Sequence, residues 1–226
     1  MSLQKKDFIE IEFTAKTKEG NIFDSNIKED LEKLDPSRKR VTKPFIFCLG
    51  EGMFLKGVEN FLIGKPSKPA SYKIELSPEN AFGNRDSKLI QKIPTKVFSE
   101  QKLKPIPGIM FNFDGRIAKV LAVSGGRVIV DFNNPIAGKD VIYEVKLLRK
   151  IEDLNEKIRS FNEFLFKKNF KFNIEKNKLS LEVDEPLIKF VEMFKDKFKE
   201  IFGLDLEVKK IEPAKKQEKI KEVVKK

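Results

Sequence analysis

The stretch IEFTAKTKEGNIFDSN, residues 11–26, is the first of several short motifs that decide the fold of this chain. KPFIFCLGEGMFLKGVENFLIGK (43–65) and LSPENAFG (76–83) follow it, and DFNNPIAGKDVIYEVKLLRKI (131–151) comes only after a long gap. Read together, these segments place many aromatic and aliphatic side chains around one aspartate, Asp24. They predict one small domain with a hydrophobic pocket, cut in two by a foreign basic segment.

The composition excludes several kinds of catalytic site. Of 226 residues, 40% are hydrophobic and 21 are Phe, but none is His. The lack of His excludes Ser-His-Asp and Cys-His catalysis and any His-ligated metal site. Cys48 is the single cysteine and lies in the alternating run FIFCLG, so we expect a buried strand residue, with no intramolecular disulfide and no Cys-based zinc site. We expect neither a metal nor a cofactor.

Nothing in the sequence indicates a membrane or an exported location. The N-terminus MSLQKKDFIE has no apolar stretch long enough for a signal peptide. No run approaches the roughly 18 apolar residues of a membrane helix. We therefore expect a soluble, cytoplasmic protein in a reducing compartment, with no membrane partner.

The net charge of +11 is concentrated in two segments. Residues 87–131 hold 8 basic and 3 acidic groups, and residues 209–226 again hold 8 and 3, so each carries a net charge of +5. The remaining two segments, 1–86 and 132–208, are close to neutral. This distribution differs from that of a uniformly basic nucleic-acid binder.

In the domain that the insert interrupts, hydrophobic periodicity predicts several strands and one helix. Residues 52–63 have apolar side chains at helical spacing, with Gly64 as the closing residue, whereas 27–40 predicts an exposed loop with one helical turn. The predicted strands are 8–17, 44–49, 71–76 and 141–151.

The inserted segment predicts a small β module. Its short β runs, 109–113, 117–123 and 127–132, are joined by Asp114-Gly115 and by Ser124-Gly125-Gly126, which are hairpin signals. Pro94 and Pro105 are expected to break any longer element before them.

The sequence after Glu152 predicts a third domain with an αββαβ pattern. Its elements are a helix over 154–170, a hairpin over 171–183 that turns at Lys176-Asn177, a helix over 186–202 with Asp184 as its N-cap, and a strand over 204–211. The end, PAKKQEKIKEVVKK, is expected to be a frayed or helical tail in solvent.

The ordered motifs resemble a known family. F-T-x-x-x-x-x-G-x-x-F-D-S, K-P-F-x-F-x-L-G, G-x-x-L-x-G-x-E and S-P-E-x-A-F-G look like an FKBP-type peptidyl-prolyl isomerase. AFGNRDSKLIQKIPTKVF, the insert and NNPIAGKDVIYEV are similar to the SlyD-type subgroup, which carries an insert-in-flap chaperone domain, and the added third domain resembles the long archaeal members. The resemblance is strong over about residues 7–152.

The resemblance implies an α+β fold, with an antiparallel sheet wrapped on a short helix. We place the isomerase domain at 1–86 and 132–152, a small inserted all-β chaperone domain at 87–131, and a C-terminal αββαβ domain with a basic tail at 153–226. A SlyD-like metal-binding tail rich in His and Cys is not expected here, because residues 209–226 have neither.

An apolar pocket suits the chemistry of prolyl isomerisation. At the top of the barrier the amide is twisted and its carbonyl is less dipolar, so an apolar pocket stabilises the twisted form relative to the planar one. By resemblance, the pocket consists of Phe13, Phe23, Asp24, Phe45, Phe54, Leu55, Val58, Ala81, Phe82 and Tyr143. Asp24 is expected to order the pocket, and the backbone N–H at the Phe54-Leu55 step to hold the carbonyl after the proline.

Three of these positions depart from the family pattern. Val58 lies where the family often has Trp, and Phe13 and Phe82 lie where Tyr is common, so the pocket is expected to be wider and to lack two hydroxyl groups. Judged one by one, the phenylalanines could equally be plain core, as we expect for Phe47, and Asp24 could be a turn or cap residue.

The insert has more apolar residues than so small a module can bury. Those expected to bind unfolded chains, beside a positive rim, are Ile93, Phe98, Ile106, Met110, Phe111 and, by its place after the insert, Ile136. The alternative is a decorative module with a filled core.

The chain therefore has three candidate functions. The first is a prolyl isomerase that is also a folding chaperone, with unfolded or nascent polypeptides containing X-Pro bonds as partners. The second is a holdase or adaptor with an FKBP-like shape and weak catalysis. The third is an RNA-associated factor, which we do not favour because no RRM or KH motif is present, so no nucleic-acid partner is expected. The stripe Phe190, Phe194, Phe198 and Phe202 predicts either packing on its own hairpin or a homodimer interface.

Overall fold

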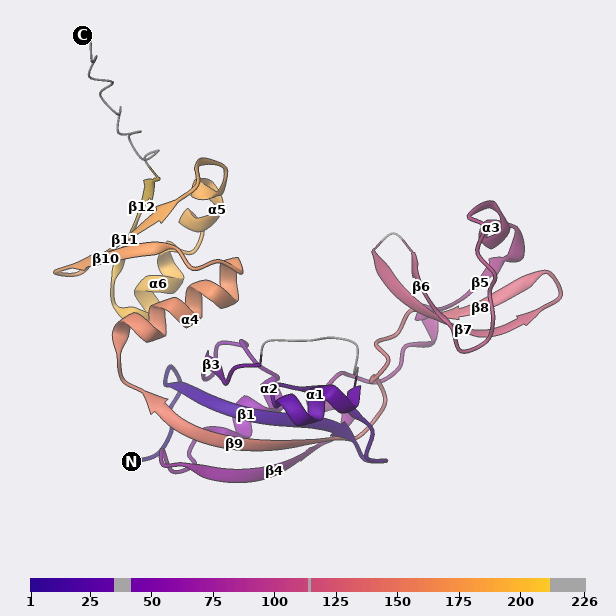
Figure 1. Ribbon diagram of the computed structural model, residues 1–226, viewed down its shortest axis with the longest axis horizontal. Coiled ribbons are helices and arrows are strands. Elements are labelled where there is room, and N and C mark those ends of the chain that lie inside the picture. Colours follow the sequence, from indigo (N-terminus) through magenta and orange to yellow (C-terminus); the bar gives the residue numbers. More distant parts are fainter. Residues whose placement is uncertain (35–41, 114, 212–226) are drawn as a thin grey trace, which may run out of the picture. The chain divides into compact units, whose positions relative to one another are not determined.

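The computed structural model describes residues 1–34, 42–113 and 115–211. It divides into two compact units, Met1–Glu152 and Asp153–Lys226, which are labelled element by element in Figure 1. Both units mix helices with β-sheet, and antiparallel pairing predominates. Among the described helices, none is both long enough and apolar enough to cross a membrane.

A five-stranded antiparallel sheet forms the centre of the first unit. Its strands are β1 (Phe8–Thr17), β2 (Ile22–Ser25), β3 (Phe45–Cys48), β4 (Ala70–Leu76) and β9 (Val141–Ile151). They run in the order β2-β1-β9-β4, and β3 pairs with the first part of β1. Four strands agree with the predicted runs to within one residue. The short strand β2 was not predicted, because four residues give too little alternation to distinguish a strand from a turn.

β1 and β9 pair along their whole lengths, from Phe8 opposite Ile151 to Thr17 opposite Val141. Side chains alternate between the two faces of these strands. Phe13 and Ala15 are therefore buried on the inner face, whereas Lys16 lies on the outer face. This alternation separates an apolar face from a charged one.

The helix α2 (Lys56–Leu62) packs on the inner face of the sheet, where the ring of Phe61 lies 5.9 Å from that of Tyr72 on β4. Gly57 allows a close approach of α2 to the end of β4 and the turn that follows it. A Cβ at this position would lie 2.4 Å from the carbonyl oxygen of Asn80 and 2.9 Å from a methyl group of Leu76. The glycine thus fixes α2 against η1 (Pro78–Asn80) and the turn that follows it.

The segment after β2 is more ordered than predicted. Where the sequence predicted an exposed loop with one turn of helix, the described part forms the seven-residue helix α1 (Lys28–Leu34), while 35–40 lies outside the described residues. The reason is a tertiary contact, because the hydroxyl of Thr14 donates a hydrogen bond of 2.6 Å to Asp30. Polar composition alone does not show this contact.

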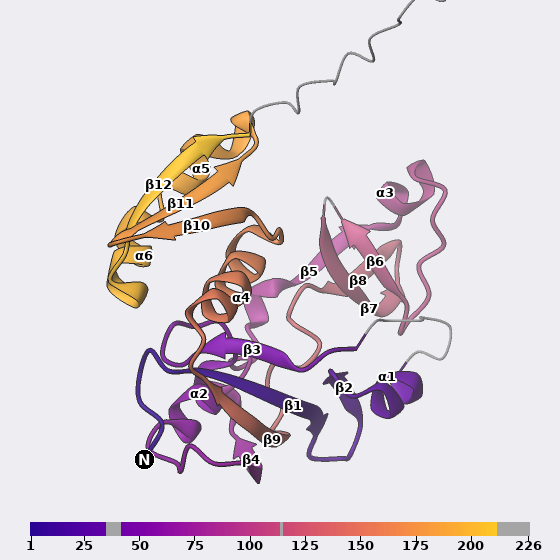
Figure 2. The ribbon, with the colours of Figure 1, turned by 60° about the vertical axis from the view of Figure 1, so that its left-hand side comes forward.

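The insert is a four-stranded antiparallel sheet with a helix, so the prediction of an all-β module was wrong. The strands β5 (Ile90–Pro94), β6 (Met110–Phe113), β7 (Arg116–Ser124) and β8 (Arg127–Asp131) run in the order β5-β8-β7-β6. The 3₁₀ turn η2 (Ser87–Leu89) precedes them, and α3 (Thr95–Glu100) follows β5 (Figure 2). Pro94 ends an edge strand and begins the helix, both of which are positions that proline tolerates.

The second unit begins with α4 (Leu154–Phe166), which ends earlier than predicted because Lys167 adopts a left-handed conformation at φ 53°. The strands β10 (Lys171–Glu175) and β11 (Lys178–Val183) form the predicted hairpin, and β12 (Asp205–Lys210) pairs parallel to β11. The chain between β11 and β12 is helical, so the αββαβ order of elements is present in this unit.

The prediction of a single helix over 186–202 was wrong. The segment forms three helical pieces, η3 (Glu185–Leu187), α5 (Ile188–Glu192) and α6 (Lys195–Phe202). A spacing of four residues drifts by about 40° per step in a regular α-helix, so a continuous helix could not direct all four phenylalanines to one partner. With the break at Met193 and Phe194, the ring of Phe166 lies 5.9 Å from Phe190 and 5.3 Å from Phe194.

The close approach at Gly57 gives a first prediction. Replacing Gly57 by Ala should destabilise the protein by about 1–3 kcal/mol, because the new methyl group must displace the backbone at Asn80. The matched change Asn60→Ala, at an exposed position of the same helix, should leave the stability nearly unchanged. Denaturant unfolding measures both, and equal midpoints for the two variants would contradict the packing argument.

Candidate functional site

The inner face of the first unit carries one continuous cluster of aromatic rings. Phe54 lies at its centre, with ring centroids 4.9 Å from Phe13, 5.7 Å from Phe45 and 5.8 Å from Tyr143. Phe23 extends the cluster, at 6.1 Å from Tyr143 and 5.6 Å from Phe82. All six of these residues were predicted site residues, and the fold brings them into contact.

Phe47 also joins the cluster, with its ring 5.3 Å from Phe54. It is fully buried, so it supports the other rings from beneath, in line with the structural role expected for it. Edge-to-face and offset contacts of this kind each contribute roughly 0.5–1.5 kcal/mol beyond the burial of area. The cluster is therefore a packed group of rings, in which Phe13 and Tyr143 are buried and Phe23, Phe45, Phe54 and Phe82 are partly exposed.

The register of three strands places Asp24 beside this surface. Ala15 pairs with Asp24 on one side and with Tyr143 on the other, so these three residues form one cross-strand row. Ala15 is small and leaves room between its two neighbours. Burial raises the pKa of the Tyr143 hydroxyl above its usual value, and the negative charge of Asp24 raises this pKa further.

The Ser25-Asn26 pair anchors β2 to β1. The N–H of Phe13 donates to the side-chain oxygen of Asn26 at 2.7 Å, and the hydroxyl of Ser25 donates to the carbonyl of Phe13 at 2.9 Å. The Ser25 N–H in turn donates to the carboxylate of Asp24 at 2.9 Å. The motif Phe-Asp-Ser-Asn therefore fixes Asp24 through the hydrogen bonds of its two neighbours.

Glu59 of α2 organises the loop between β3 and the helix. The residue is 2% exposed, and its carboxylate accepts hydrogen bonds from the N–H groups of Gly50 at 2.8 Å, Gly52 at 3.3 Å and Phe54 at 2.7 Å. These bonds hold residues 50–54 in turns, so the helix begins only at Lys56 and not at residue 52 as predicted. Glu59 is the last residue of the motif G-x-x-L-x-G-x-E, but the motif alone does not indicate this role.

The same bonds distinguish two neighbouring N–H groups. The Phe54 N–H is occupied by Glu59, whereas the Leu55 N–H donates no hydrogen bond to any residue within the described parts of the chain. Leu55 begins α2 in an extended conformation. Its N–H is therefore a donor held at a fixed place next to the ring of Phe54.

The remaining predicted pocket residues lie in α2 and in the turn after β4. Val58 is fully buried, so it supports the site and presents no surface of its own. Ala81 and Phe82 are partly buried and follow η1, whose position depends on Gly57. Among the described ring contacts, Phe82 joins the cluster through Phe23.

The predicted substrate-binding residues of the insert divide into two groups. Ile106 is 45% exposed and Met110 is 50% exposed, as expected for a binding surface. Phe98 has no exposed surface and forms the core of the insert, so the prediction that it contacts a ligand was wrong. Ile93 and Phe111 pack against this core and are only partly buried, so their predicted role stays a prediction. Ile136 is partly buried and lies beyond the sheet of the insert.

Other apolar residues of the insert are exposed although they were not predicted to bind a ligand. Ile90, Ile117, Leu121 and Val123 are 37–59% exposed. Along β7 the small residues Ala118 and Val120 face inward, while the larger Ile117 faces outward. The size of a side chain was therefore a poor guide to its exposure. The alternation of side chains along the strand was the signal that could have found these exposed residues.

Two segments connect the insert to the isomerase half-domains, and they are bonded to each other. Asn133 donates to the carbonyl of Asp86 at 3.0 Å and accepts from the Asp86 N–H at 2.9 Å. Arg85 forms an ion pair with Asp131. Burial alone would raise the pKa of Asp131, but the hydrogen bonds from Asn133 and the charge of Arg85 together lower the pKa below its usual value.

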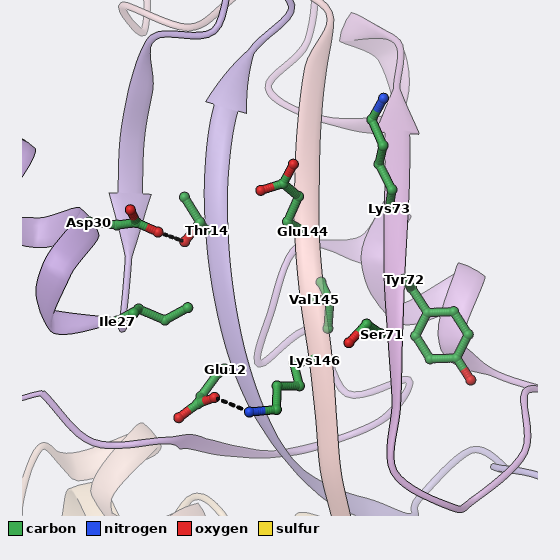
Figure 3. Close-up of a pocket in the computed structure, with 10 residues that line it drawn as sticks. All are labelled: Glu12, Thr14, Ile27, Asp30, Ser71, Tyr72, Lys73, Glu144, Val145 and Lys146. Carbon is green, nitrogen blue, oxygen red and sulfur yellow. Dashed lines mark hydrogen bonds and ion pairs between the residues drawn. The ribbon is translucent and has the colours of Figure 1, made fainter.

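The outer face of the same sheet carries a separate hollow of about 480 Å³, drawn in Figure 3. Its side chains are mainly polar, and they bond to one another. Glu12 pairs with Lys146 at 3.1 Å, and Thr14 donates to Asp30 at 2.6 Å. Two further charged residues of the lining pair with neighbours outside it, Glu144 with Lys16 and Lys73 with Glu75. The charges of the hollow are therefore compensated, in contrast to the apolar inner face.

Comparison with known proteins places these features in a family. The family model described as "FKBP26, IF domain" matches residues 91–136. A short-type peptidyl-prolyl cis-trans isomerase of Methanocaldococcus jannaschii is 28% identical over 146 residues, which cover 64% of this chain and 92% of that protein. A probable FKBP-type 16 kDa peptidyl-prolyl cis-trans isomerase of Pseudomonas fluorescens is 31% identical over 108 residues, which cover 46% of this chain and 71% of that protein.

This chain belongs to the FKBP-type peptidyl-prolyl cis-trans isomerases. The SlyD isomerase of Pasteurella multocida is also similar, at 24% identity over 162 residues, covering 70% of this chain and 74% of that protein. The match to the IF domain begins in β5 and ends in the segment that returns to β9. The resemblance stated from the motifs is thus confirmed, and the chain is an isomerase.

The loop of this isomerase gives a second prediction. Glu59→Gln should destabilise the protein by about 1–3 kcal/mol, because the amide cannot accept all three N–H groups in a buried place. Hydrogen exchange at Gly50 and Phe54 should become faster in the variant. The control Glu75→Gln changes an exposed carboxylate and should do neither. Unchanged exchange at Gly50 and Phe54 in Glu59→Gln would contradict the role assigned to Glu59.

The raised pKa of Tyr143 gives a third prediction. In the variant Tyr72→Phe, Tyr143 is the only tyrosine, and its phenolate absorbance should not appear at the ordinary pKa of about 10. The folded state then holds a proton that the unfolded state releases. The stability that this provides is fully present below about pH 10 and is lost as the pH rises through the folded pKa.

The contribution of Asp24 to this titration is separable. Adding Asp24→Asn to Tyr72→Phe should lower the pKa of Tyr143, although burial should keep it above the ordinary value. An absorbance curve that does not move between the two variants would show that Asp24 and Tyr143 do not interact.

Proposed function

We propose that the X-Pro bond is isomerised on the aromatic cluster of the inner face, without a cofactor. The observation that carries this proposal is the set of six predicted rings joined by ring contacts, with Asp24 in the same cross-strand row as Tyr143 and with the Leu55 N–H making no hydrogen bond within the described parts of the chain. An apolar surface with one donor and one carboxylate is well suited to a planar amide that must lose its planarity.

The chemistry requires only differential binding. Rotation about the peptide bond crosses a barrier of about 18–20 kcal/mol, and the amide loses its resonance at the top. The twisted carbonyl is less dipolar, so the aromatic cluster stabilises it better than it stabilises the planar form. The Leu55 N–H holds the carbonyl after the proline, which fixes one side of the bond while the other rotates.

We further propose that the insert captures unfolded polypeptides and supplies their prolines to the cluster. Its sheet exposes Met110 at 50% and Ile117 at 59%, and Ile106 lies open in the loop before β6. Apolar side chains left open on so small a module are typical of a binding surface. Thioether side chains such as Met110 adapt to varied partners.

The alternative is a holdase chaperone or adaptor with an FKBP-like fold and weak catalysis. Two features favour it. Phe13 and Phe82 offer no hydroxyl to a substrate, and Val58 has no exposed surface. In this case the aromatic cluster would bind chains without accelerating rotation.

The experiment that separates these functions measures cis/trans exchange of an X-Pro peptide by NMR. Asp24→Ala should lower the catalysed rate about tenfold, which corresponds to about 1.4 kcal/mol of transition-state stabilisation. The control Glu144→Gln changes a carboxylate of the outer face, one residue from Tyr143, and should keep the rate. A wild type that leaves exchange at its uncatalysed rate would support the holdase reading.

A deletion tests the role of the insert. The Phe132 N–H and the Leu89 carbonyl are 2.9 Å apart, so a short glycine turn can replace residues 90–131. The shortened protein should keep its rate on the peptide and lose its effect on the refolding of an unfolded protein limited by proline isomerisation. Equal acceleration of refolding with and without the insert would refute the capture role.

A further inference from the structure

The sheet of the insert has two faces of different character. The inner face is filled by Phe98 of α3, which packs on Ala118, Val120, Val128 and Val130. Because side chains alternate along each strand, the residues between these point to the outer face. The four strands of the sheet therefore display a second set of side chains, which α3 does not cover.

Strand register defines this outer face residue by residue. Ile90 pairs with Asp131, Asp131 with Lys119, and Lys119 with Met110, so these four form one row across the sheet. Lys92 lies opposite Ile129 in the next row. Ile90, Met110 and Ile117 on this face are 37%, 50% and 59% exposed. Aliphatic and basic side chains thus alternate on one surface.

The basic side chains of this face are available to a partner of the opposite sign. Lys92, Lys119 and Arg127 are exposed, and none of the three forms an ion pair with another residue of the described chain. Asp131 is the acidic residue of the face within the described part, and it is 6% exposed and engaged by Arg85 and Asn133. The outer face is consequently positive and has open apolar positions between its charges.

We propose that this face selects unfolded segments in which aliphatic residues are interspersed with Asp and Glu. This inference rests on the proposed capture function and names its substrate class. Apolar client side chains would cover Ile90, Met110 and Ile117, while client carboxylates would pair with Lys92, Lys119 and Arg127. Charge complementarity of this kind favours the binding of a partner of opposite charge and makes the binding free energy of a like-charged partner less favourable.

A single-stranded nucleic acid fits this surface less well. Proteins that bind such strands stack successive bases on exposed aromatic rings. On the insert, Phe111 and Phe113 pack against the inner core, and the exposed apolar residues of the outer face are aliphatic. A peptide therefore matches both the charge and the apolar character of the surface, whereas a phosphate chain matches only the charge.

The test uses three peptides of equal length without proline, so that the isomerase cluster is not engaged. They share the same aliphatic residues and differ only in having Glu, Gln or Lys between them. In fluorescence anisotropy with the full chain, the Glu peptide should bind about threefold more tightly than the Gln peptide and about tenfold more tightly than the Lys peptide. Raising the salt from about 50 mM to about 300 mM should remove most of this difference.

Charge variants locate the effect. Lys92→Gln with Lys119→Gln should reduce the affinity for the Glu peptide to that for the Gln peptide, and should leave the Gln peptide unchanged. Lys96→Gln with Lys102→Gln removes the same charge from α3 and the turn after it, and should preserve the selectivity. Met110→Ser with Ile117→Ser should weaken all three peptides.

The outcomes distinguish this inference from the function on which it rests. Equal affinity for the Glu and Gln peptides would refute the selectivity and leave capture intact. Binding of none of the peptides would refute capture and the inference together. The proposal would be overturned if a single-stranded RNA displaced the Glu peptide and lost its affinity in the variant with Lys92→Gln and Lys119→Gln. The face would then be assigned to nucleic acid.

Discussion

The pairing of β1 with β9 is the constraint on which the first unit depends. It joins residues 8–17 to 141–151, so the chain between them must leave the sheet and return to it. The register of this pairing sets Tyr143 beside Ala15 and hence beside Asp24, and it places Phe13 on the same face. A shift by one residue would turn every side chain of β9 to the opposite face and would dissolve the aromatic cluster. The site therefore exists through a long-range register, and the local motifs only supply its members.

The sheet of the insert also has two faces of different character. Its inner face is closed by one helix, and its outer face combines aliphatic and basic side chains. The connection to the half-domains is narrow but bonded, because Asn133 and Asp131 bridge the outgoing and returning segments. The isomerase cluster can thus remain intact while the insert presents a surface of its own. In our proposal, one face of this chain binds a twisted amide and another binds unfolded segments.

The sequence predicted the strands of the isomerase half-domains to within one residue, because each buries one face and alternates clearly. It also named six residues that meet in the aromatic cluster. It failed where a tertiary contact decides the local structure. Thr14 orders α1, Glu59 delays the start of α2, and Phe166 gathers Phe190 and Phe194 around a break in the predicted helix. The exposed residues of the insert were misjudged because the large ring of Phe98 is buried while the smaller Ile117 is not.

The most direct test of this account is chemical-shift mapping of the backbone amides during titration with an X-Pro peptide. The outer hollow is a real competitor, because it offers about 480 Å³ on the other side of the same sheet. Our account predicts that the largest changes occur at the Leu55 N–H and at Phe54, Asp24 and Tyr143. Changes confined to Thr14, Glu144 and Lys73 on the outer face, with Leu55 unmoved, would contradict it.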